Sequence, residues 1–278
     1  MMIKKRSSSF HSLIWCSIAA AFTLPASAFA GDAKFLNVFD KSKMKEVVPN
    51  TMVSKIEGRH IGAEAWLVVG GTAPFNKGKS HHHPEEHFWM QMAGDATHYA
   101  VEFNDGKVHE YDGDAGLVMH MPPGQQHTGG HGKEDAYMVT VTKPLGITTV
   151  AARSTDVETK DHYDTFDFDD AALTVSEKDW VYTRKGKLGA GLGEEAVLIK
   201  KATKKDYIVS ARKAPAEEVA IVYKGHVKVT GCGESRVLGP GDLFYCPGAL
   251  MYTGLGKEDA RVVRVFTPAD ASSFVSKY

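Results

Sequence analysis

The chain has few cysteines, almost no charge imbalance and no long apolar run beyond its first thirty residues. Only 3 of its 278 residues are cysteine, too few for a disulfide scaffold. Cys232 and Cys246 alone follow residue 30, and the sequence leaves open whether they pair. Basic and acidic residues number 33 and 34, without a basic stripe, which argues against a nucleic-acid partner. What remains is the composition of a folded globular protein.

Residues 1–30 have the pattern of a secretory signal peptide. A basic start at Lys4–Arg6 is followed by an apolar stretch over residues 13–24 and by an A-x-A cleavage pattern at Ala28–Ala30. The apolar stretch is too short for a retained bilayer anchor. We therefore expect a periplasmic or secreted mature chain that has no membrane partner once the signal is removed.

Beyond the signal, the pattern predicts an all-β protein. Short apolar runs end at or near Gly, Pro, Asn or Asp, and turn signals recur between them. The runs are Ala65–Val69, Phe88–Met92, His98–Phe103, Leu117–Met121 and Tyr137–Thr142. Many short strands at close spacing are typical of a β-sandwich or barrel. No series of alternating helices supports a parallel α/β sheet.

The chain also repeats itself on either side of an acidic segment. Pro122–Gly129 resembles Pro247–Gly254, and the five residues Gly132–Ala136 recur as Gly256–Ala260. Two copies of one β-domain explain this repeat. The segment between them has room for a short helix or an edge strand. The expected organisation is a signal peptide over 1–30, a first domain over 31–150, an acidic linker over 151–174 and a second domain over 175–278.

Histidines are concentrated in the first copy. Ten of the twelve that follow residue 30 lie between His60 and His131, most densely over His81–His87. Alternate residues of a strand face one way, so His81 and His83 share a face. Further along, His87, Trp89 and Gln91 share another face, which we expect to be the barrel interior. His127 follows a proline–glycine turn that can bring a strand across the same interior.

These residues form two motifs that resemble the cupin superfamily. His81-x-His83, three residues, His87, six residues and Gly94 are similar to the first conserved cupin motif. Gly116, five residues and Pro122-Pro123-Gly124-Gln125-Gln126-His127 are similar to the second. Most cupins carry Glu where this chain has His87, so the pattern resembles the less common four-histidine cupins. The resemblance implies antiparallel jelly-roll barrels, here two in tandem.

The same resemblance implies one divalent transition metal in the first barrel. Its ligands would be His81, His83, His87 and His127. Imidazole ligands suit Fe, Cu, Mn, Ni or Zn, and the sequence does not distinguish among them.

The second copy keeps the turns but not the ligands. Alignment places Arg212, Ala214 and Glu218 opposite His81, His83 and His87, and it places Tyr252 opposite His127. The chain therefore resembles a bicupin, a protein of two cupin domains, with a metal site in the first domain and a second domain without metal.

Neighbouring side chains supply further candidates. Strand alternation points Glu86 away from the interior, so it ranks below His87 as a ligand, and His82 is expected to face solvent or to lie outside the ligand set. Trp89 and Gln91 are expected to contact the substrate, and His120 is a candidate acid–base group lining the pocket. His98 and His131 are weaker candidates for that role. Core packing accounts better than copper binding for the four methionines Met90, Met92, Met119 and Met121.

Four neutral imidazoles leave a bound metal its full double charge, which favours anionic or enolate oxygen ligands. The leading hypothesis is a dioxygenase acting on a small enolisable or phenolic substrate, as the resemblance to all-histidine cupins implies. A redox-neutral isomerase, lyase or decarboxylase is the second hypothesis, and a binding module without turnover is the third. We also expect the second domain to bury an edge of the first barrel, and the chain is a candidate homodimer.

Overall fold

A computed structural model describes most of the chain beyond the expected signal peptide. It covers residues 33–71, 81–94, 97–102, 108–129, 132–144, 150–151, 163–177, 180–186, 189–201, 208–211, 216–271 and 274–277. The expected signal peptide lies outside these residues. Within them, no helix is long and apolar enough to cross a membrane.

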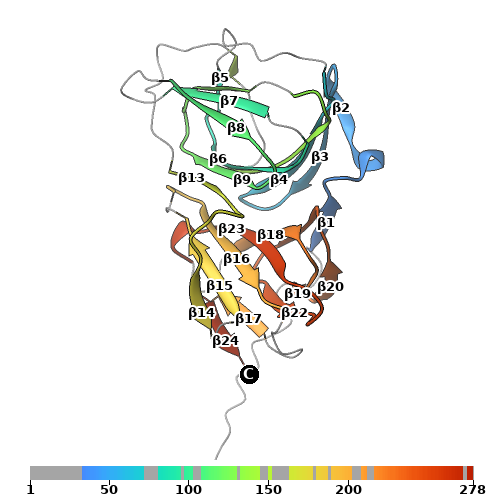
Figure 1. Cartoon of the computed structure of the whole chain (residues 1–278), viewed down its shortest axis with the longest axis vertical. Helices are drawn as coiled ribbons and strands as arrows, with labels where there is room; N and C mark the ends of the chain where they lie inside the picture. The colour runs from blue at the N-terminus through green and yellow to red at the C-terminus, as the bar shows by residue number, and fades with distance from the viewer. Residues whose placement is uncertain are drawn as a thin grey trace, which may run out of the picture.

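The described residues form two β-barrels, each made of a seven-stranded and a five-stranded sheet. Figure 1 shows the two barrels stacked along the long axis of the molecule. Every described strand pair is antiparallel, and the described helical segments are two short 3-10 turns, η1 (Lys41–Lys43) and η2 (Ala269–Ala271). The all-β prediction of two antiparallel barrels is confirmed.

The first barrel carries the histidine-rich segment. Its large sheet has the order β13-β9-β6-β11-β4-β3-β2, and its small sheet has the order β12-β5-β10-β7-β8. The large-sheet strands are β2 (Lys45–Val48), β3 (Thr51–Glu57), β4 (Gly62–Val68), β6 (Glu86–Ala93), β9 (Leu117–Met121), β11 (Ala136–Lys143) and β13 (Asp164–Asp167). The small-sheet strands are β5 (His81–His82), β7 (Thr97–Glu102), β8 (Val108–Gly113), β10 (His127–Gly129) and β12 (Val150–Ala151).

The second barrel repeats this plan. Its large sheet has the order β1-β21-β18-β23-β16-β15-β14, and its small sheet has the order β20-β19-β22-β17-β24. The large-sheet strands are β1 (Lys34–Asn37), β14 (Thr174–Glu177), β15 (Val181–Lys185), β16 (Gly193–Ile199), β18 (Glu217–Lys224), β21 (Asp242–Cys246) and β23 (Ala260–Thr267). The small-sheet strands are β17 (Ile208–Ala211), β19 (Val227–Gly231), β20 (Glu234–Leu238), β22 (Met251–Gly254) and β24 (Phe274–Lys277).

Two strands do not belong to the part of the molecule expected from their position in the chain. Strand β1 precedes the first barrel but pairs with β21 of the second, Phe35 lying opposite Phe244. Strand β13 falls in the expected linker yet pairs with β9 of the first barrel, Phe166 lying opposite Val118. The sheets therefore differ from the expected domain ranges at these two strands.

The largest apolar core lies between the barrels rather than inside either one. Phe88 and Val139 from the first large sheet pack in one cluster with Val219 and Val263 from the second. The opposite faces of the same strands line the two barrel interiors, which hold separate apolar clusters. Each large sheet is therefore buried on both faces, and alternate residues belong to different cores.

The turn after each first-motif strand explains one repeated glycine. Gly94 follows β6 and Gly225 follows β18, with φ of 98° and 69°. A Cβ atom at Gly94 would lie 2.2 Å from the carbonyl oxygen of Asp135, and one at Gly225 would lie 2.1 Å from that of Asp259. Only glycine fits so close to the neighbouring backbone in this conformation.

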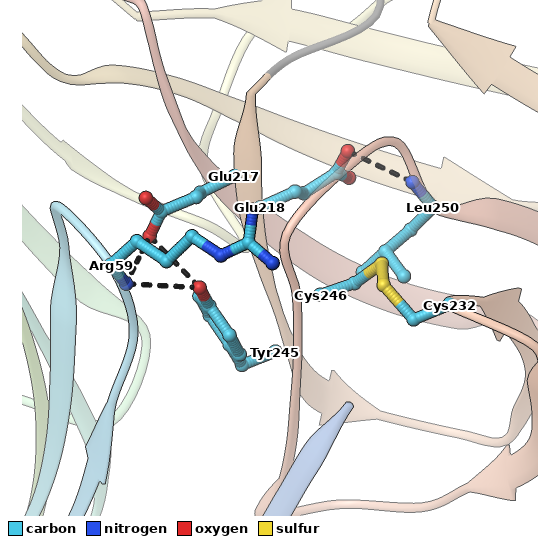
Figure 2. The surroundings of a disulfide bond; sticks show 7 residues. All are labelled: Arg59, Glu217, Glu218, Cys232, Tyr245, Cys246 and Leu250. Atoms are coloured by element: carbon cyan, nitrogen blue, oxygen red, sulfur yellow. Dashed lines mark hydrogen bonds between the residues drawn. A yellow bond between two sulfur atoms is a disulfide. The ribbon is translucent and has the colours of Figure 1, made fainter. Parts of the chain in front are cut away.

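Cys232 and Cys246 form a disulfide with a Cα–Cα distance of 5.8 Å. This settles the pairing that the sequence left open. The bond ties the turn after β19 to the end of β21 in the second barrel (Figure 2).

Candidate metal centre

Three of the predicted ligands meet inside the first barrel. One ring nitrogen from each of His81, His83 and His127 lies within 4.8 Å of the others. Strand pairing brings two of them together, since His127 at the start of β10 is directly opposite His81 of β5. Among the described residues, this is the one group of His, Cys, Asp or Glu side chains with the spacing of metal ligands.

His87 reaches the same place from the large sheet. Its ring centroid lies 4.9 Å from that of His83 and 5.5 Å from that of His127. Its Nδ1 atom is buried and has no hydrogen-bond partner in the described part of the chain. A buried ring nitrogen without a partner costs free energy, so this orphaned atom fits a site that takes up a ligand or an ion. His87 thus lies beside the other three histidines, although it is outside the group whose ring nitrogens lie within 4.8 Å of one another.

Burial favours the neutral, metal-binding form of two of these histidines. Burial lowers the pKa of His87 well below its ordinary value, and the nearby His83 ring lowers it further. Burial likewise lowers the pKa of His127, reinforced by His81. Neutral imidazole is the form that binds metals. His127 also donates from Nδ1 to the carbonyl oxygen of Gln125 at 3.0 Å, which leaves its Nε2 lone pair for a ligand bond.

Trp89 and Gln91 lie on the same face of β6 as His87. Trp89 belongs to the interior apolar cluster and donates from Nε1 to the sulfur of Met138 at 3.3 Å. Gln91 is fully buried, and its Nε2 donates to the carbonyl oxygen of Ala93 at 2.8 Å. The interior beside the histidines is therefore mainly aromatic and thioether in character.

The four methionines divide between two cores. Met119 and Met121 pack in the interior cluster with Trp89, whereas Met90 and Met92 pack in the core between the barrels. These contacts agree with a packing role for all four.

His120 is not placed where the sequence predicted it. It lies opposite Phe88 in the β6–β9 pairing, and Phe88 faces the second barrel rather than the interior. His120 Nε2 is 2.9 Å from Glu86 Oε1, and its ring is 5.1 Å from that of Tyr163. Strand alternation thus turns His120 toward the interface between the barrels, which corrects its prediction as a pocket acid or base.

Two neighbours of the ligands also have defined places. Glu86 faces the second barrel and accepts hydrogen bonds from the backbone of Gly191 and Leu192, at 2.7 and 3.1 Å. It is not available as an alternative ligand. His82 is buried, with Gln126 Nε2 3.0 Å from its Nδ1, so of its two expected placements the solvent-facing one is wrong. His98 and His131 lie outside the residues whose side chains are described.

Sequence reasoning missed a carboxylate in the interior. Glu64 on β4 is 3% exposed, and it lies opposite Thr140 on β11. Its strand neighbour two residues on, Trp66, packs on the interior cluster and donates to Thr140 Oγ1 at 3.1 Å. Lys55 Nζ lies 2.7 Å from Glu64 Oε1. No alternation of polar and apolar residues marked it in the sequence, because its neighbours Ala63 and Ala65 are buried in the core between the barrels.

The equivalent position in the second barrel holds ion pairs instead of histidines. Arg264 donates from Nε and Nη2 to the two oxygens of Glu218, at 2.5 and 2.8 Å, and from Nη1 to Glu195 at 2.8 Å. Tyr252 donates to Glu218 at 2.5 Å. Burial opposes the charge of Arg264, but Glu218 holds the pKa of the guanidinium above its usual value. Arg212 and Ala214 of the expected alignment lie outside the described residues.

No protein-family model and no curated protein matches the chain. Solved structures of oxalate decarboxylase match its fold. One, from a study of the Mn(II) centres of the Bacillus subtilis enzyme, has a TM-score of 0.62 at 12% identity and covers 89% of this chain and 79% of that one. Another, from a study of substrate binding and reaction specificity in oxalate decarboxylase, has a TM-score of 0.62 at 13% identity over the same shares. The cupin fold is therefore supported at the structural level, together with a histidine cluster that can bind a metal.

Proposed function

We propose that this chain is a metal-dependent cupin enzyme with its active site in the first barrel. His81, His83, His87 and His127 would hold one divalent transition metal. The observation that carries this proposal is the gathering of four imidazoles, of which His83, His87 and His127 are buried, and burial lowers the pKa of two of them. When bound, the metal would supply Lewis acidity and, if it is redox-active, a centre for dioxygen chemistry.

The interior favours a substrate with an apolar body. Trp66, Trp89, Met119, Met121 and Met138 line the side of the barrel next to the histidines. These side chains would pack against an aromatic or alkyl group while an enolate or phenolate oxygen points toward the histidines. Trp89 and Gln91 would shape the site, Gln91 being fixed in place by its bond to Ala93. We therefore propose a dioxygenase acting on a small enolisable or phenolic substrate.

A decarboxylase is the second candidate, favoured by two observations. The matched solved structures are of oxalate decarboxylase, and Glu64 places a buried carboxyl group in the interior. Decarboxylation breaks a carbon–carbon bond, releases carbon dioxide and leaves an electron pair on the remaining carbon. That carbon must then take up a proton, which the Lys55 ammonium would supply by way of the Glu64 carboxylate that it contacts.

Parallel assays on metal-loaded protein separate these functions. Chain loaded with iron, manganese or copper is offered β-diketones, catechols and small dicarboxylic acids, with and without oxygen. A dioxygenase consumes one dioxygen per substrate and forms no product under argon. A decarboxylase releases carbon dioxide under argon, and Glu64→Gln slows it by about 100-fold. Bound metal without turnover in any assay would favour the binding module.

We also propose that the chain is exported. The Cys232–Cys246 disulfide supports this, because such bonds persist in oxidising compartments. Fractionation of cells producing the full chain tests it. The protein should be found in the periplasm or the medium, shortened by about thirty residues.

A further inference from the structure

Two glutamates make matching contacts across the interface between the barrels. Glu86, the first residue of β6, accepts hydrogen bonds from the backbone of Gly191 and Leu192 in the second barrel, at 2.7 and 3.1 Å. Glu217, the first residue of β18, accepts from the backbone of residues 59–61 in the first barrel, at 2.8 to 3.3 Å. Both carboxylates are buried. Each barrel thus binds a turn of the other barrel. We call each glutamate together with the turn that it binds a clasp.

The two clasps repeat in detail. The first turn is closed by a bond from Gly58 N to the carbonyl oxygen of Ile61, and the second by one from Gly189 N to that of Leu192, both of 3.0 Å. A ring-bearing side chain also contacts each carboxylate. His120 Nε2 lies 2.9 Å from Glu86, and the Tyr245 hydroxyl donates to Glu217 at 3.0 Å.

The clasps are also in contact with each other. Lys143 lies opposite Glu86 in the β6–β11 pairing, and Thr267 lies opposite Glu217 in the β18–β23 pairing. Lys143 Nζ donates to Thr267 Oγ1 at 2.8 Å. The interface therefore repeats about an approximate two-fold axis, and the two halves can serve as controls for each other.

The clasps differ in the residue that follows each glutamate. After Glu217 comes Glu218, which points the opposite way, into the second barrel, where it accepts from the backbone of Leu250 (Figure 2). After Glu86 comes His87, which points into the cluster of predicted metal ligands. Because neighbouring residues of a strand share a peptide bond and face opposite sides, the contact that fixes Glu86 also fixes the backbone of His87.

We infer that the second barrel positions the metal ligand His87 through the turn Gly189–Leu192 and the carboxylate of Glu86. This inference rests on the proposed metal centre and assigns a role to the barrel without histidine ligands. Glu86 is a positioning residue, since it acts on the centre through His87. Partners that orient metal ligands commonly change metal affinity by about 10- to 100-fold when they are altered.

The close approach of each turn provides a matched pair of substitutions. A Cβ atom at Gly189 would lie 1.6 Å from Glu86 Oε1 and 2.9 Å from the His120 ring, so Gly189→Ala must displace the Glu86 carboxylate. A Cβ atom at Gly58 would lie 2.7 Å from Glu217 Oε2, 2.5 Å from the Tyr245 ring and 2.4 Å from the carbonyl oxygen of Ile61 in the same turn. Gly58→Ala thus disturbs the same kind of clasp from the barrel that carries the histidines.

The test measures cobalt(II) binding and the visible spectrum of the cobalt-loaded full chain for wild type, Gly189→Ala and Gly58→Ala. Thermal unfolding reports the structural cost of each change. Both variants should unfold at lower temperature. Gly189→Ala should weaken cobalt binding about tenfold or more and alter the spectrum, although it lies in the other barrel. Gly58→Ala should bind like wild type within about twofold, although it lies in the barrel that binds the metal.

Glu86→Gln and Glu217→Gln form a second, milder pair if either alanine variant does not fold. The same asymmetry is expected, because only Glu86 precedes a ligand. Equal cobalt affinities and spectra within each pair would overturn the positioning role while leaving the metal centre intact. A wild-type chain that binds no cobalt would overturn the metal centre and, with it, this inference.

Discussion

The two barrels differ at equivalent interior positions, where the first has histidine rings and the second has carboxylates paired with an arginine. Where β6 and β18 enter their barrels, histidine rings gather in one interior and carboxylates surround Arg264 in the other. The first arrangement has no cation of its own and is suited to receive one. In the second arrangement the cation is the guanidinium of Arg264, which is part of the chain. Under the proposed function, both barrels therefore have a cationic centre, which is a bound metal in the first and Arg264 in the second.

Strand pairing shows which positions changed. Thr140 on β11 lies between Trp89 and Glu64, and Arg264 on β23 lies between Ala220 and Glu195. Glu64 and Glu195 therefore occupy equivalent places, and the long guanidinium stands where the first barrel has a short threonine. Without an arginine at this place, Glu64 is accompanied by Lys55 from the neighbouring strand.

The largest expected effect is on the second barrel, where the cation can be removed by substitution. Arg264→Met leaves Glu218 and Glu195 buried without their partner, so the free energy of unfolding should fall by about 3–5 kcal/mol. Urea unfolding measures this change. Arg261→Met, on the same strand but paired at the surface with Asp169, should cost less than about 1 kcal/mol. Similar losses for both would mean that the buried network does not hold the second barrel together.

The disulfide gives a second difference between the barrels. Replacing both Cys232 and Cys246 by serine reopens a loop whose ends are 14 residues apart, which should lower the free energy of unfolding by about 3 kcal/mol. Metal content of the folded variant should stay unchanged, because the bond lies in the barrel without the histidine cluster. Loss of metal at full folding would show that the bond supports the first barrel.

The two buried histidines of the first barrel should lower the stability of the metal-free chain in acid. His87 and His127 have lowered pKa values when folded but ordinary values near 6.5 when unfolded. Below about pH 6.5 the unfolded chain therefore binds more protons, and stability falls with decreasing pH by up to about 1.4 kcal/mol per unit for each ring. Urea unfolding between pH 7 and 5 measures the slope, which should flatten in the double variant His87→Gln, His127→Gln. An unchanged slope would place the acid sensitivity elsewhere.

The gathering of the four histidines could be predicted from the sequence because their spacing repeats a known motif and follows strand alternation. His81, His83 and His87 lie within seven residues, so no long-range knowledge was needed to group them. The fold followed equally from short apolar runs and from the repeat of turn sequences.

His120 and Glu64 could not be placed in this way, since the large sheet is buried on both faces. Ala63 and Ala65 flank Glu64 and face the other core, so no polar–apolar alternation marks the interior face of β4. The orientation of His120 depends on its pairing with Phe88, and this pairing cannot be read from the sequence. The clasps join residues more than 100 positions apart in the chain. Such contacts follow only from the packing of the two barrels.

Metal content tests the account most directly. Elemental mass spectrometry of the purified chain is compared with His127→Ala and with Tyr252→Phe, its counterpart in the second barrel. The account predicts about one transition-metal ion per chain in the wild type and in Tyr252→Phe, and none in His127→Ala. A wild-type chain without metal after reconstitution, or a His127→Ala chain that keeps its metal, would contradict it.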